Sequence, residues 1–222
     1  MNKVYTTGES SLLEYHSKIF SKWFRLSIYS PKKGYLGAVV SDITKEKVSA
    51  EEIQKYAYQD YLTGLPNRRL LDDRLADAIL QATSTNTNVA VIFMDLDNFK
   101  PVNDTYGHDA GDKLLQHLAN RIVRCVRDSD TVSRIGGDEF VVILPNIHER
   151  AEAELMAVRL LEVCRKPFTI KRNKLCVSAS IGVSMFPYDG TNITELIRNS
   201  DMAMYKSKRK GRNQVCFVDE CG

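Results

Sequence analysis

A continuous apolar run near the middle of the chain limits the possible folds more than any other sequence feature. Residues 88–94 read Asn-Val-Ala-Val-Ile-Phe-Met, and no polar side chain follows Asn88 within the run. A strand with one face in water alternates apolar and polar residues, whereas a strand covered on both faces does not. The run is also too short for a helix of ordinary length. It therefore predicts a strand inside a sheet that carries helices on both faces.

The segments after this strand alternate between helical and strand patterns. We predict a helix that Asp109 caps, with an apolar stripe of Leu114, Leu118, Ile122 and Val126. Further along we predict a hairpin at 131–144 with its turn at Gly136-Gly137, a helix at 149–165, a second hairpin at 168–184, a helix from Asn192 to 208 and a strand at 214–218. The resulting order, βαββαββαβ, predicts the α+β class with a mixed, largely antiparallel central sheet flanked by helices.

The first part of the chain has a different character. Strands are predicted at 22–29 and 35–41 around a turn at 30–34, and so few strands cannot close a core alone. From Asp42 to about Asp60 the pattern is charged and helical, with a short seven-residue repeat of Ile43, Ala50 and Ala57, and the linker is placed at 45–58. Two heptads are too few for a coiled coil, so we predict a short N-terminal β segment and a linker helix.

Composition excludes several classes of protein. A net charge of +3 is too small for a surface that coats a nucleic-acid polymer. The five cysteines are scattered without a CxxC pair, which argues against a disulfide framework or a zinc site and fits a reducing compartment. The start lacks a signal-peptide pattern, and no stretch approaches the ~18 apolar residues of a membrane segment. We therefore expect a cytoplasmic protein with no membrane segment in this chain.

Two acidic motifs suggest metal chemistry. Asp95-Leu96-Asp97 stands where the buried strand ends, and carboxylates with a neighbouring carbonyl can hold a hard cation. Asp138 and Glu139 follow two glycines that leave room for a bulky anion, which such acids would repel unless a divalent cation intervened. Each motif alone also fits a solvated loop or turn.

A basic segment, Tyr205-Lys-Ser-Lys-Arg-Lys-Gly-Arg-Asn213, ends the last predicted helix. Cations stabilise a helix C-terminus, and Gly211 fits a C-cap, so the charge has a structural explanation. That explanation does not require cations on both sides of the glycine. Lys208 and Arg212 could together grip a triphosphate.

Five blocks in one order resemble the GGDEF family of diguanylate cyclases. They are Asp60-Tyr-Leu-Thr-Gly-Leu-Pro-Asn-Arg68, Asp95-Leu-Asp-Asn-Phe-Lys100, Asn103-Asp-Thr-Tyr-Gly-His-Asp-Ala-Gly-Asp112, Gly136-Gly-Asp-Glu-Phe140 and Lys208-Arg-Lys-Gly-Arg-Asn213. The resemblance implies a GGDEF domain of the palm-like nucleotidyl cyclase fold over residues 59–220. It also implies that the domain condenses two GTP into cyclic di-GMP and releases two pyrophosphates.

The resemblance assigns roles residue by residue. Asp138 would be the catalytic proton acceptor, with Glu139 beside it. Mg²⁺, or Mn²⁺ as a substitute, would be held by Asp95, the carbonyl of Leu96 and Asp138. The substrate-binding positions would be Lys100, Lys208 and Arg212 for the phosphates, Asn103 and Asp112 for the guanine edge, His108 in the nucleotide site, and Gly136 and Gly137 at the turn. An Asp can accept both hydrogens that guanine offers, and adenine has no such pair of donors.

A product-inhibition site is implied as well. Arg127 and Asp130 form an RxxD motif, and five residues separate Asp130 from Gly136. This placement resembles the family's site for cyclic di-GMP, with Arg159 as an auxiliary contact. RxxD alone also fits a helix-end salt bridge. Because one site holds one GTP and the product contains two nucleotides, two domains must face each other. Family members do so as antiparallel homodimers.

Residues 12–44 resemble the last strands of a PAS sensor, so a PAS-like remnant is expected at 1–44 before the linker at 45–58. The chain is thus expected to be a fragment of a longer sensor protein or a shortened gene product. The Leu-Pro-Asn-Arg and Asp-Leu-Asp blocks also resemble GGDEF halves of proteins that carry an EAL phosphodiesterase. Two other classes stay open, a nucleotide-binding module and an interaction domain, although degenerate members lose the signature acids that this chain keeps.

Overall fold

A computed structural model of the chain describes residues 4, 9–32, 35–170 and 173–219, with the backbone alone at 50–54. The chain divides between Tyr56 and Ala57 into two compact units, each described here by itself. Parts of three sequence predictions lie outside the described residues. They concern the turn at 33–34, the hairpin tip at 171–172 and the side chain of Ala50 in the seven-residue repeat.

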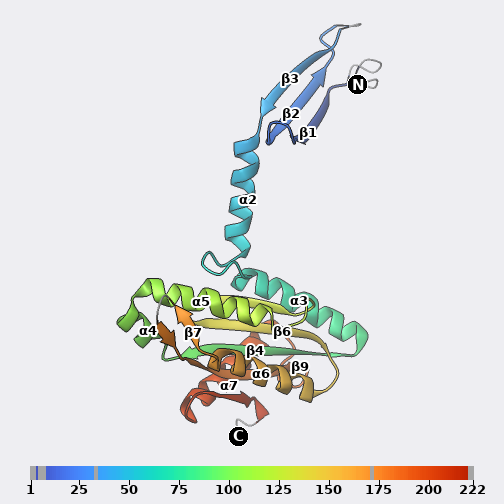
Figure 1. The fold of residues 1–222 in the computed structure, drawn as a ribbon. Coiled ribbons are helices and arrows are strands. Elements are labelled where there is room, and N and C mark those ends of the chain that lie inside the picture. The colour runs from blue at the N-terminus through green and yellow to red at the C-terminus, as the bar shows by residue number, and fades with distance from the viewer. Residues whose placement is uncertain (1–3, 5–8, 33–34, 171–172, 220–222) are drawn as a thin grey trace. The chain divides into compact units, whose positions relative to one another are not determined.

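The N-terminal unit is a three-stranded antiparallel sheet followed by a helix (Figure 1). Its elements are β1 (Ser11–Ser17), β2 (Lys22–Tyr29), β3 (Gly37–Asp42) and α2 (Thr44–Tyr58). The two predicted strands are confirmed, and β1 adds a third along the edge of β2. Ile43, only 1% exposed, anchors the junction between β3 and α2. The Trp23 carbonyl accepts the Ile43 amide hydrogen at 2.9 Å, which fixes where the strand gives way to the helix.

The second unit contains the central sheet. Its helices are α3 (Arg68–Thr85), α4 (Phe99–Tyr106), α5 (His108–Val123), α6 (Arg150–Arg165) and α7 (Ile193–Arg209). Its strands are β4 (Asn88–Asp97), β5 (Thr131–Gly136), β6 (Glu139–Ile147), β7 (Phe168–Ile170), β8 (Asn173–Leu175), β9 (Ser178–Phe186) and β10 (Gln214–Phe217).

The central sheet has the strand order β10-β9-β4-β6-β5. β10 pairs with β9 in parallel, and the other neighbours pair antiparallel. The predicted α+β class with a mixed, largely antiparallel sheet is therefore confirmed.

Within the described residues, every helix is either too short or too polar to cross a membrane.

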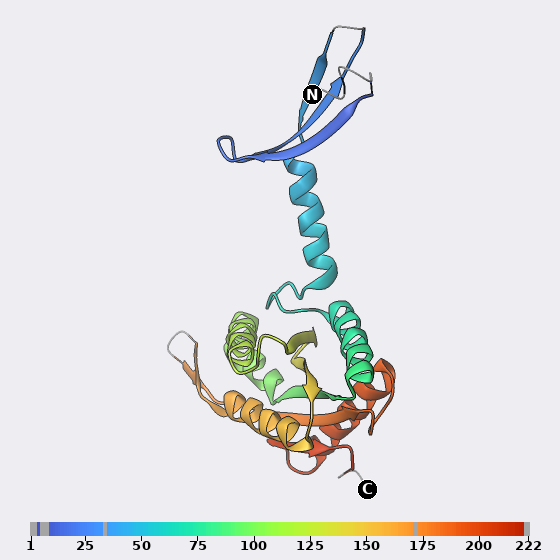
Figure 2. The ribbon, with the colours of Figure 1, turned by 90° about the vertical axis from the view of Figure 1, so that its right-hand side faces the viewer.

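Strand β4 lies at the centre of the sheet and is covered on both faces (Figure 2). Successive side chains of a strand point to opposite faces. Ala90, Ile92 and Met94 pack in one core with α5 and α6, while the residues between them pack in a second core with α3 and α7. The apolar run is thus buried on both sides, as its lack of alternation predicted.

Three local predictions were wrong. α5 ends at Val123, so Val126 packs against the core from the following turn. Gly107 occupies the N-cap, and Asp109 lies in the first helical turn. The segment 168–184 is not one hairpin, because β7 pairs only with short β8 while β9 joins the central sheet. β9 is almost wholly buried, so its apolar residues suit the interior better than a surface hairpin.

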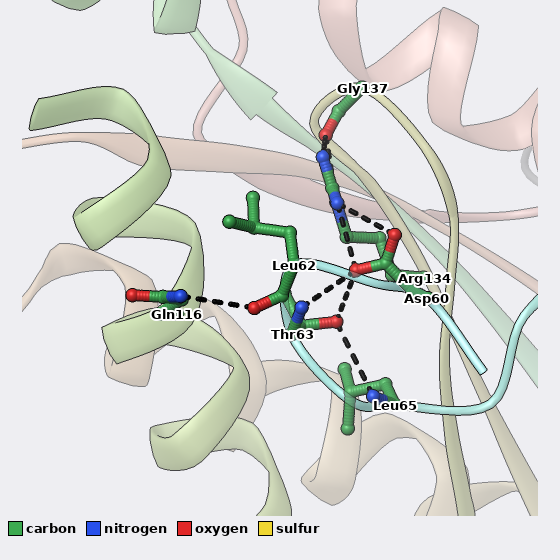
Figure 3. Close-up of polar contacts among 7 residues, drawn as sticks. All are labelled: Asp60, Leu62, Thr63, Leu65, Gln116, Arg134 and Gly137. Carbon is green, nitrogen blue, oxygen red and sulfur yellow. Dashed lines mark hydrogen bonds and ion pairs between the residues drawn. The ribbon is translucent and has the colours of Figure 1, made fainter. Parts of the chain in front are cut away.

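A buried ion pair ties the loop before α3 to the hairpin of β5 and β6 (Figure 3). The Asp60 carboxylate accepts hydrogen bonds from Arg134 Nη1 at 2.8 and 2.9 Å. The same guanidinium donates through Nε and Nη2 to the Gly137 carbonyl at 3.0 and 2.7 Å. Arg134 and Asp60 side chains are 8% and 12% exposed. One arginine therefore fixes both the loop and the glycine turn.

The same loop is held at two further points (Figure 3). Thr63 donates to Asp60 Oδ1 through its backbone N–H at 2.9 Å and its hydroxyl at 2.6 Å. Gln116 on α5 donates to the Leu62 carbonyl at 3.1 Å. Burial by itself would raise the pKa of Asp60, but the hydrogen bonds from Thr63 and Arg134 outweigh it and hold this pKa below its usual value.

We predict that Gly182→Ala strongly destabilises the second unit. A Cβ at this position of β9 would lie 2.0 Å from the Ser200 carbonyl oxygen and 2.1 Å from the Met204 amide nitrogen, both in the backbone of α7. Overpacking of this kind costs ~1–3 kcal/mol or more in free energy of unfolding. Urea unfolding measures the loss. Gly37→Ala is the matched control, because its close neighbour is the movable ring of Tyr29. Equal unfolding midpoints for the two variants would contradict the prediction.

We predict that Asp60→Ala lowers the free energy of unfolding by ~3–5 kcal/mol at pH 7, because it leaves the Arg134 charge buried without its partner. The pKa of Asp60 is lowered in the folded protein. Its stabilising contribution is then complete above roughly pH 4 and is lost as pH falls through the folded value. Urea titrations at pH 7 and pH 3 should show the deficit of the variant shrinking in acid. Asp72→Ala, which breaks the exposed pair with Arg68, should cost less than ~0.5 kcal/mol.

Candidate functional site

The C-terminal end of β4 places two carboxylates on the α7 side of the sheet. Met94 and Leu96 belong to the core under α5 and α6, so alternation directs Asp95 and Asp97 to the opposite face. Both acids are buried, with 8% and 3% of their surface exposed. β4 continues through Asp97, so these acids stand inside the strand rather than in a loop after it. The alternative of two solvated loop acids is wrong.

The glycine turn between β5 and β6 brings a second pair of acids to the same place. Gly137 has φ +48° and open space where a Cβ would stand. The following Asp138 is joined to β4, because its carbonyl accepts the Leu96 amide hydrogen at 3.3 Å. Glu139 lies directly opposite Asp95 across the paired strands. The turn therefore presents its acids beside the end of β4.

A cavity of about 380 Å³ opens at this point. Its size is within the range of small-molecule sites. Acids of β4 and the turn form one side of it, the start of α4 forms another, and cations from the end of α7 face them. The lining residues are Asp95, Leu96, Asp97, Asn98, Phe99, Lys100, Pro101, Asp138, Lys208 and Arg212. Six positions predicted to hold metal or phosphate thus meet in one cavity.

Several charged side chains lie close together in the cavity. Lys208 Nζ lies 2.7 Å from Asp95 Oδ2. Burial raises the pKa of Asp95. The hydrogen bond from Lys208 opposes this rise, and the negative charge of Asp138 adds to it. Burial also raises the pKa of Glu139, together with the charges of Asp95 and Asp201. The raised pKa values of Asp95 and Glu139 indicate that the cations lining the cavity do not fully offset the burial of these carboxylates, so the site favours additional positive charge beside them.

The donor set fits a small hard cation. Asp95 and Asp138 supply carboxylates and the Leu96 carbonyl is an oxygen ligand, which are the donors that Mg²⁺ takes from proteins. Among the described residues no group of three or more His, Cys, Asp or Glu side chains is arranged to hold a metal ion. A cation here would thus rely on few protein ligands and draw the remaining oxygens from elsewhere, as is usual for Mg²⁺ beside phosphates.

The start of α4 is a feature that the sequence did not reveal. Asn98 adopts a left-handed conformation (φ +59°, ψ +31°) and its side chain makes no capping hydrogen bond. The first residues of α4 line the cavity, and the Asn98 side chain does not cap their amide groups. A helix N-terminus of this kind attracts anions. Asn after Asp97 in the sequence was a weak indication, since Asn tolerates the left-handed region.

The predicted guanine-binding residues lie on α4 and α5, outside the lining of this cavity. Asn103 packs against the first turn of α5, where a Cβ on Gly111 would lie 1.9 Å from its Oδ1. This oxygen is buried and has no hydrogen-bond partner among the described residues. His108 and Asp112 are exposed, one turn apart on α5. The structure therefore groups the three residues where α4 meets α5, outside the lining of the cavity.

The RxxD residues form a turn after α5. The Arg127 amide donates to Asp130 Oδ2 at 2.8 Å, and the Arg127 guanidinium lies 3.8 Å from Glu152 at the start of α6. The two residues of the motif are thus joined by a backbone hydrogen bond, and the ion pair of Arg127 is with Glu152 at the end of a helix rather than with Asp130. Arg159 lines a different cavity of about 540 Å³ between α5 and α6, in which Arg127 takes no part.

Asp60 and Arg134 are the positioning residues that the sequence prediction missed. Asp60 began one of the quoted blocks and Arg134 stood two residues before another, but nothing in the sequence paired residues 74 positions apart. The Asp60-x-x-Thr63 spacing was the available signal, because such residues form local side-chain turns.

Comparison with known proteins agrees with these features. The family model described as "Diguanylate cyclase, GGDEF domain" matches residues 57–214. The bifunctional diguanylate cyclase/cyclic di-GMP phosphodiesterase MucR of Pseudomonas aeruginosa is 48% identical over 168 residues, which are 76% of this chain and 24% of that protein. The chain spans about a quarter of the length of the curated relatives it first matches.

Two solved structures have the same fold. The crystal structure of the GGDEF domain of PA1120 (YfiN or TpbB) from Pseudomonas aeruginosa matches with a TM-score of 0.69 and 36% identity, covering 70% of this chain and 97% of that one. The coiled coil and GGDEF domain of DgcB from Caulobacter crescentus, in complex with c-di-GMP, matches with a TM-score of 0.69 and 27% identity, covering 79% and 93%. With a family match over most of its length and a shared fold, this chain belongs to the GGDEF-domain family.

Proposed function

We propose that this domain is a diguanylate cyclase, which condenses two GTP molecules into cyclic di-GMP and releases two pyrophosphates. One observation carries the proposal: Asp95 and Asp138 line the same cavity as Lys208 and Arg212. Acids alone would repel a triphosphate and cations alone would only bind it, whereas the combination suits phosphoryl transfer. Relatives named as diguanylate cyclases support the same reaction.

Asp95, Asp138 and the Leu96 carbonyl would hold Mg²⁺, with Mn²⁺ as a substitute. When bound, the ion would lower the proton affinity of a ribose 3′-hydroxyl and neutralise charge on the reacting phosphate. Asp138 stands at the open tip of the hairpin and would accept the hydroxyl proton, with Glu139 beside it on β6. The hydrogen bond from Arg134 to the Gly137 carbonyl would keep this turn rigid during the transfer.

The phosphates would lie between the start of α4 and the end of α7. Lys100, Lys208 and Arg212 line the cavity from these two directions. Arg212 offers a planar fork that matches phosphate oxygens, while Lys208 acts as a compact charge. Lys208 would exchange its contact with Asp95 for the substrate. The free amide groups at the start of α4 add neutral donors.

The guanine would lie beside α5. Asn103 on α4, which packs against Gly111 of α5, would contribute to reading the guanine edge. The Asp112 carboxylate, one residue after Gly111, would accept the ring and amino hydrogens. His108 would line the same site. This arrangement favours GTP over ATP, because adenine offers no matching pair of donors.

Catalysis would require a homodimer. Each domain offers one site, and the product joins two nucleotides, so each domain must present a hydroxyl to the phosphate held by its partner. The exposed turn of Arg127 and Asp130 would bind product and hold the domains apart, with Arg159 contributing from α6. The c-di-GMP complex of DgcB supports product binding by this fold. The N-terminal sheet and α2 would be the end of a PAS-like sensor and its linker.

We predict that Asp138→Asn lowers cyclic di-GMP formation about 100-fold or more, because it removes a proton acceptor and a metal ligand together. GTP binding should persist through Asn103, Asp112 and Lys208. Chromatography of the GTP and Mg²⁺ reaction at two protein concentrations measures product formation, and calorimetry with GTP measures binding. For the unmodified protein the rate should fall more steeply than linearly with dilution. Asp73→Asn, an exposed acid on α3, is the control and should match the unmodified protein. Normal product formation by Asp138→Asn would refute the assignment.

We predict that Arg127→Ala relieves product inhibition. Loss of a charged hydrogen-bond donor should weaken cyclic di-GMP binding at the turn by about 10-fold or more. Initial rates with increasing added cyclic di-GMP give the inhibition constant. Asp128→Asn changes an exposed residue of the same turn outside the motif and should leave inhibition intact. An unchanged inhibition constant in Arg127→Ala would exclude this site.

A further inference from the structure

Asp97 is a buried acid to which the proposed reaction assigns no role. It is 3% exposed on the α7 face, two residues beyond Asp95. Its carboxylate accepts hydrogen bonds from Ser180 Oγ at 2.7 Å, from Ser178 Oγ at 2.7 Å and from the Asn213 amide at 3.0 Å. The two serines belong to β9, while Asn213 belongs to the loop after α7. Asp97 thus connects the centre of the sheet to the basic loop.

That loop has a costly backbone conformation. Gly211, Arg212 and Asn213 follow one another with φ of +115°, +65° and +50°. Residues other than glycine seldom enter this region, and they remain there only when their surroundings hold them. Two such residues in succession therefore require external contacts. The Arg212 amide has one, to the Ser207 carbonyl at 3.0 Å.

Asn213 is held from two sides. Its amide donates to Asp97 Oδ2, and its own oxygens accept from Arg165 at the end of α6. Arg165 Nε reaches the Asn213 side-chain oxygen at 2.7 Å, and Nη2 reaches the carbonyl at 3.0 Å. The bonds to Asp97 and to Arg165 are both charge-assisted, and Asp97 is the buried partner, held in turn by two serines of β9. Asp97 therefore fixes the loop from the sheet side, and Arg165 holds it from α6.

The direction of the Arg212 side chain follows from this backbone. Arg212 immediately precedes Asn213 and lines the same cavity as Lys208 and Asp138. If the amide of Asn213 were released, the loop could relax to ordinary φ values and carry the guanidinium away. We propose that Asp97 is a positioning residue, which holds Arg212 in the orientation that binds the substrate phosphates. This inference rests on the proposed function, in which Arg212 binds triphosphate.

The test compares GTP with guanosine, because guanosine has the base but no phosphate. Binding to the full 222-residue chain is measured by calorimetry in EDTA, so that neither metal nor turnover contributes. Arg212→Ala should weaken GTP binding about 10-fold, the loss of one charged hydrogen-bonding group. Asp97→Ala should weaken GTP binding by about the same factor and leave guanosine binding unchanged. A residue that merely stabilised the fold would weaken both ligands.

A double variant shows whether Asp97 acts through Arg212. If it does, Asp97→Ala with Arg212→Ala should bind GTP about as well as Arg212→Ala alone, since the same interaction cannot be lost twice. Additive losses of about 100-fold would overturn the proposal, and so would equal weakening of guanosine. Asp97→Asn is the conservative variant. Its oxygen can still accept the Asn213 amide while a serine hydroxyl turns to accept from its nitrogen, so GTP affinity should largely return.

Ser178→Ala is a second variant that tests the same inference if Asp97→Ala does not fold. It removes one donor from Asp97 Oδ2 and leaves the carboxylate in place. GTP affinity should fall about 2–5-fold in the unmodified background and not at all in Arg212→Ala. Equal loss in both backgrounds would overturn the inference. The proposed function fails separately: an unmodified chain that forms no cyclic di-GMP from GTP and Mg²⁺ would refute it, whereas cyclic di-GMP formation together with additive variants would refute only the role of Asp97.

Discussion

The burial of β4 at the centre of the sheet is the constraint on which the rest of this structure depends. β4 is hydrogen-bonded to β6 on one edge and to β9 on the other, and each face is covered by two helices. A strand in this position has no water to solvate polar groups along its length. When it ends in Asp95 and Asp97, each carboxylate must find a specific partner. The geometry of the site therefore depends on which groups pair with Asp95 and which pair with Asp97.

The two acids are satisfied in different ways. Asp95 faces Lys208 from α7 and shares its surroundings with Asp138, so it keeps an exchangeable cation within a cavity. Asp97 accepts three neutral donors and stays fixed. Alternation in a strand places both on the same face, two residues apart. One acid is thus available for binding chemistry while the other anchors the loop that surrounds it.

Rigid positioning of the glycine turn comes from a distant part of the chain. Glycine at the tip gives room for a large anion, but it also leaves the turn with little conformational restraint. Arg134 compensates by donating to the Gly137 carbonyl while its charge is held by Asp60. A buried charge pair is a strong restraint because breaking either half leaves the other unsatisfied. The loop that follows α2 therefore bears directly on the geometry of the turn.

The sequence by itself determined the family, the fold class and the chemical types in the site. Unbroken apolar residues at 88–94 required a strand covered on both faces, and the ordered blocks around Gly136-Gly137 indicated the GGDEF fold. Local patterns gave wrong predictions where packing between distant segments decided the structure. The residues of β9, for example, join the central sheet instead of forming a hairpin. Only the tertiary structure decided that Asp60 pairs with Arg134 and that Asp97 receives the Asn213 amide. Those contacts join residues 74 and 116 positions apart, and no periodic pattern encodes a distance that depends on how whole elements pack.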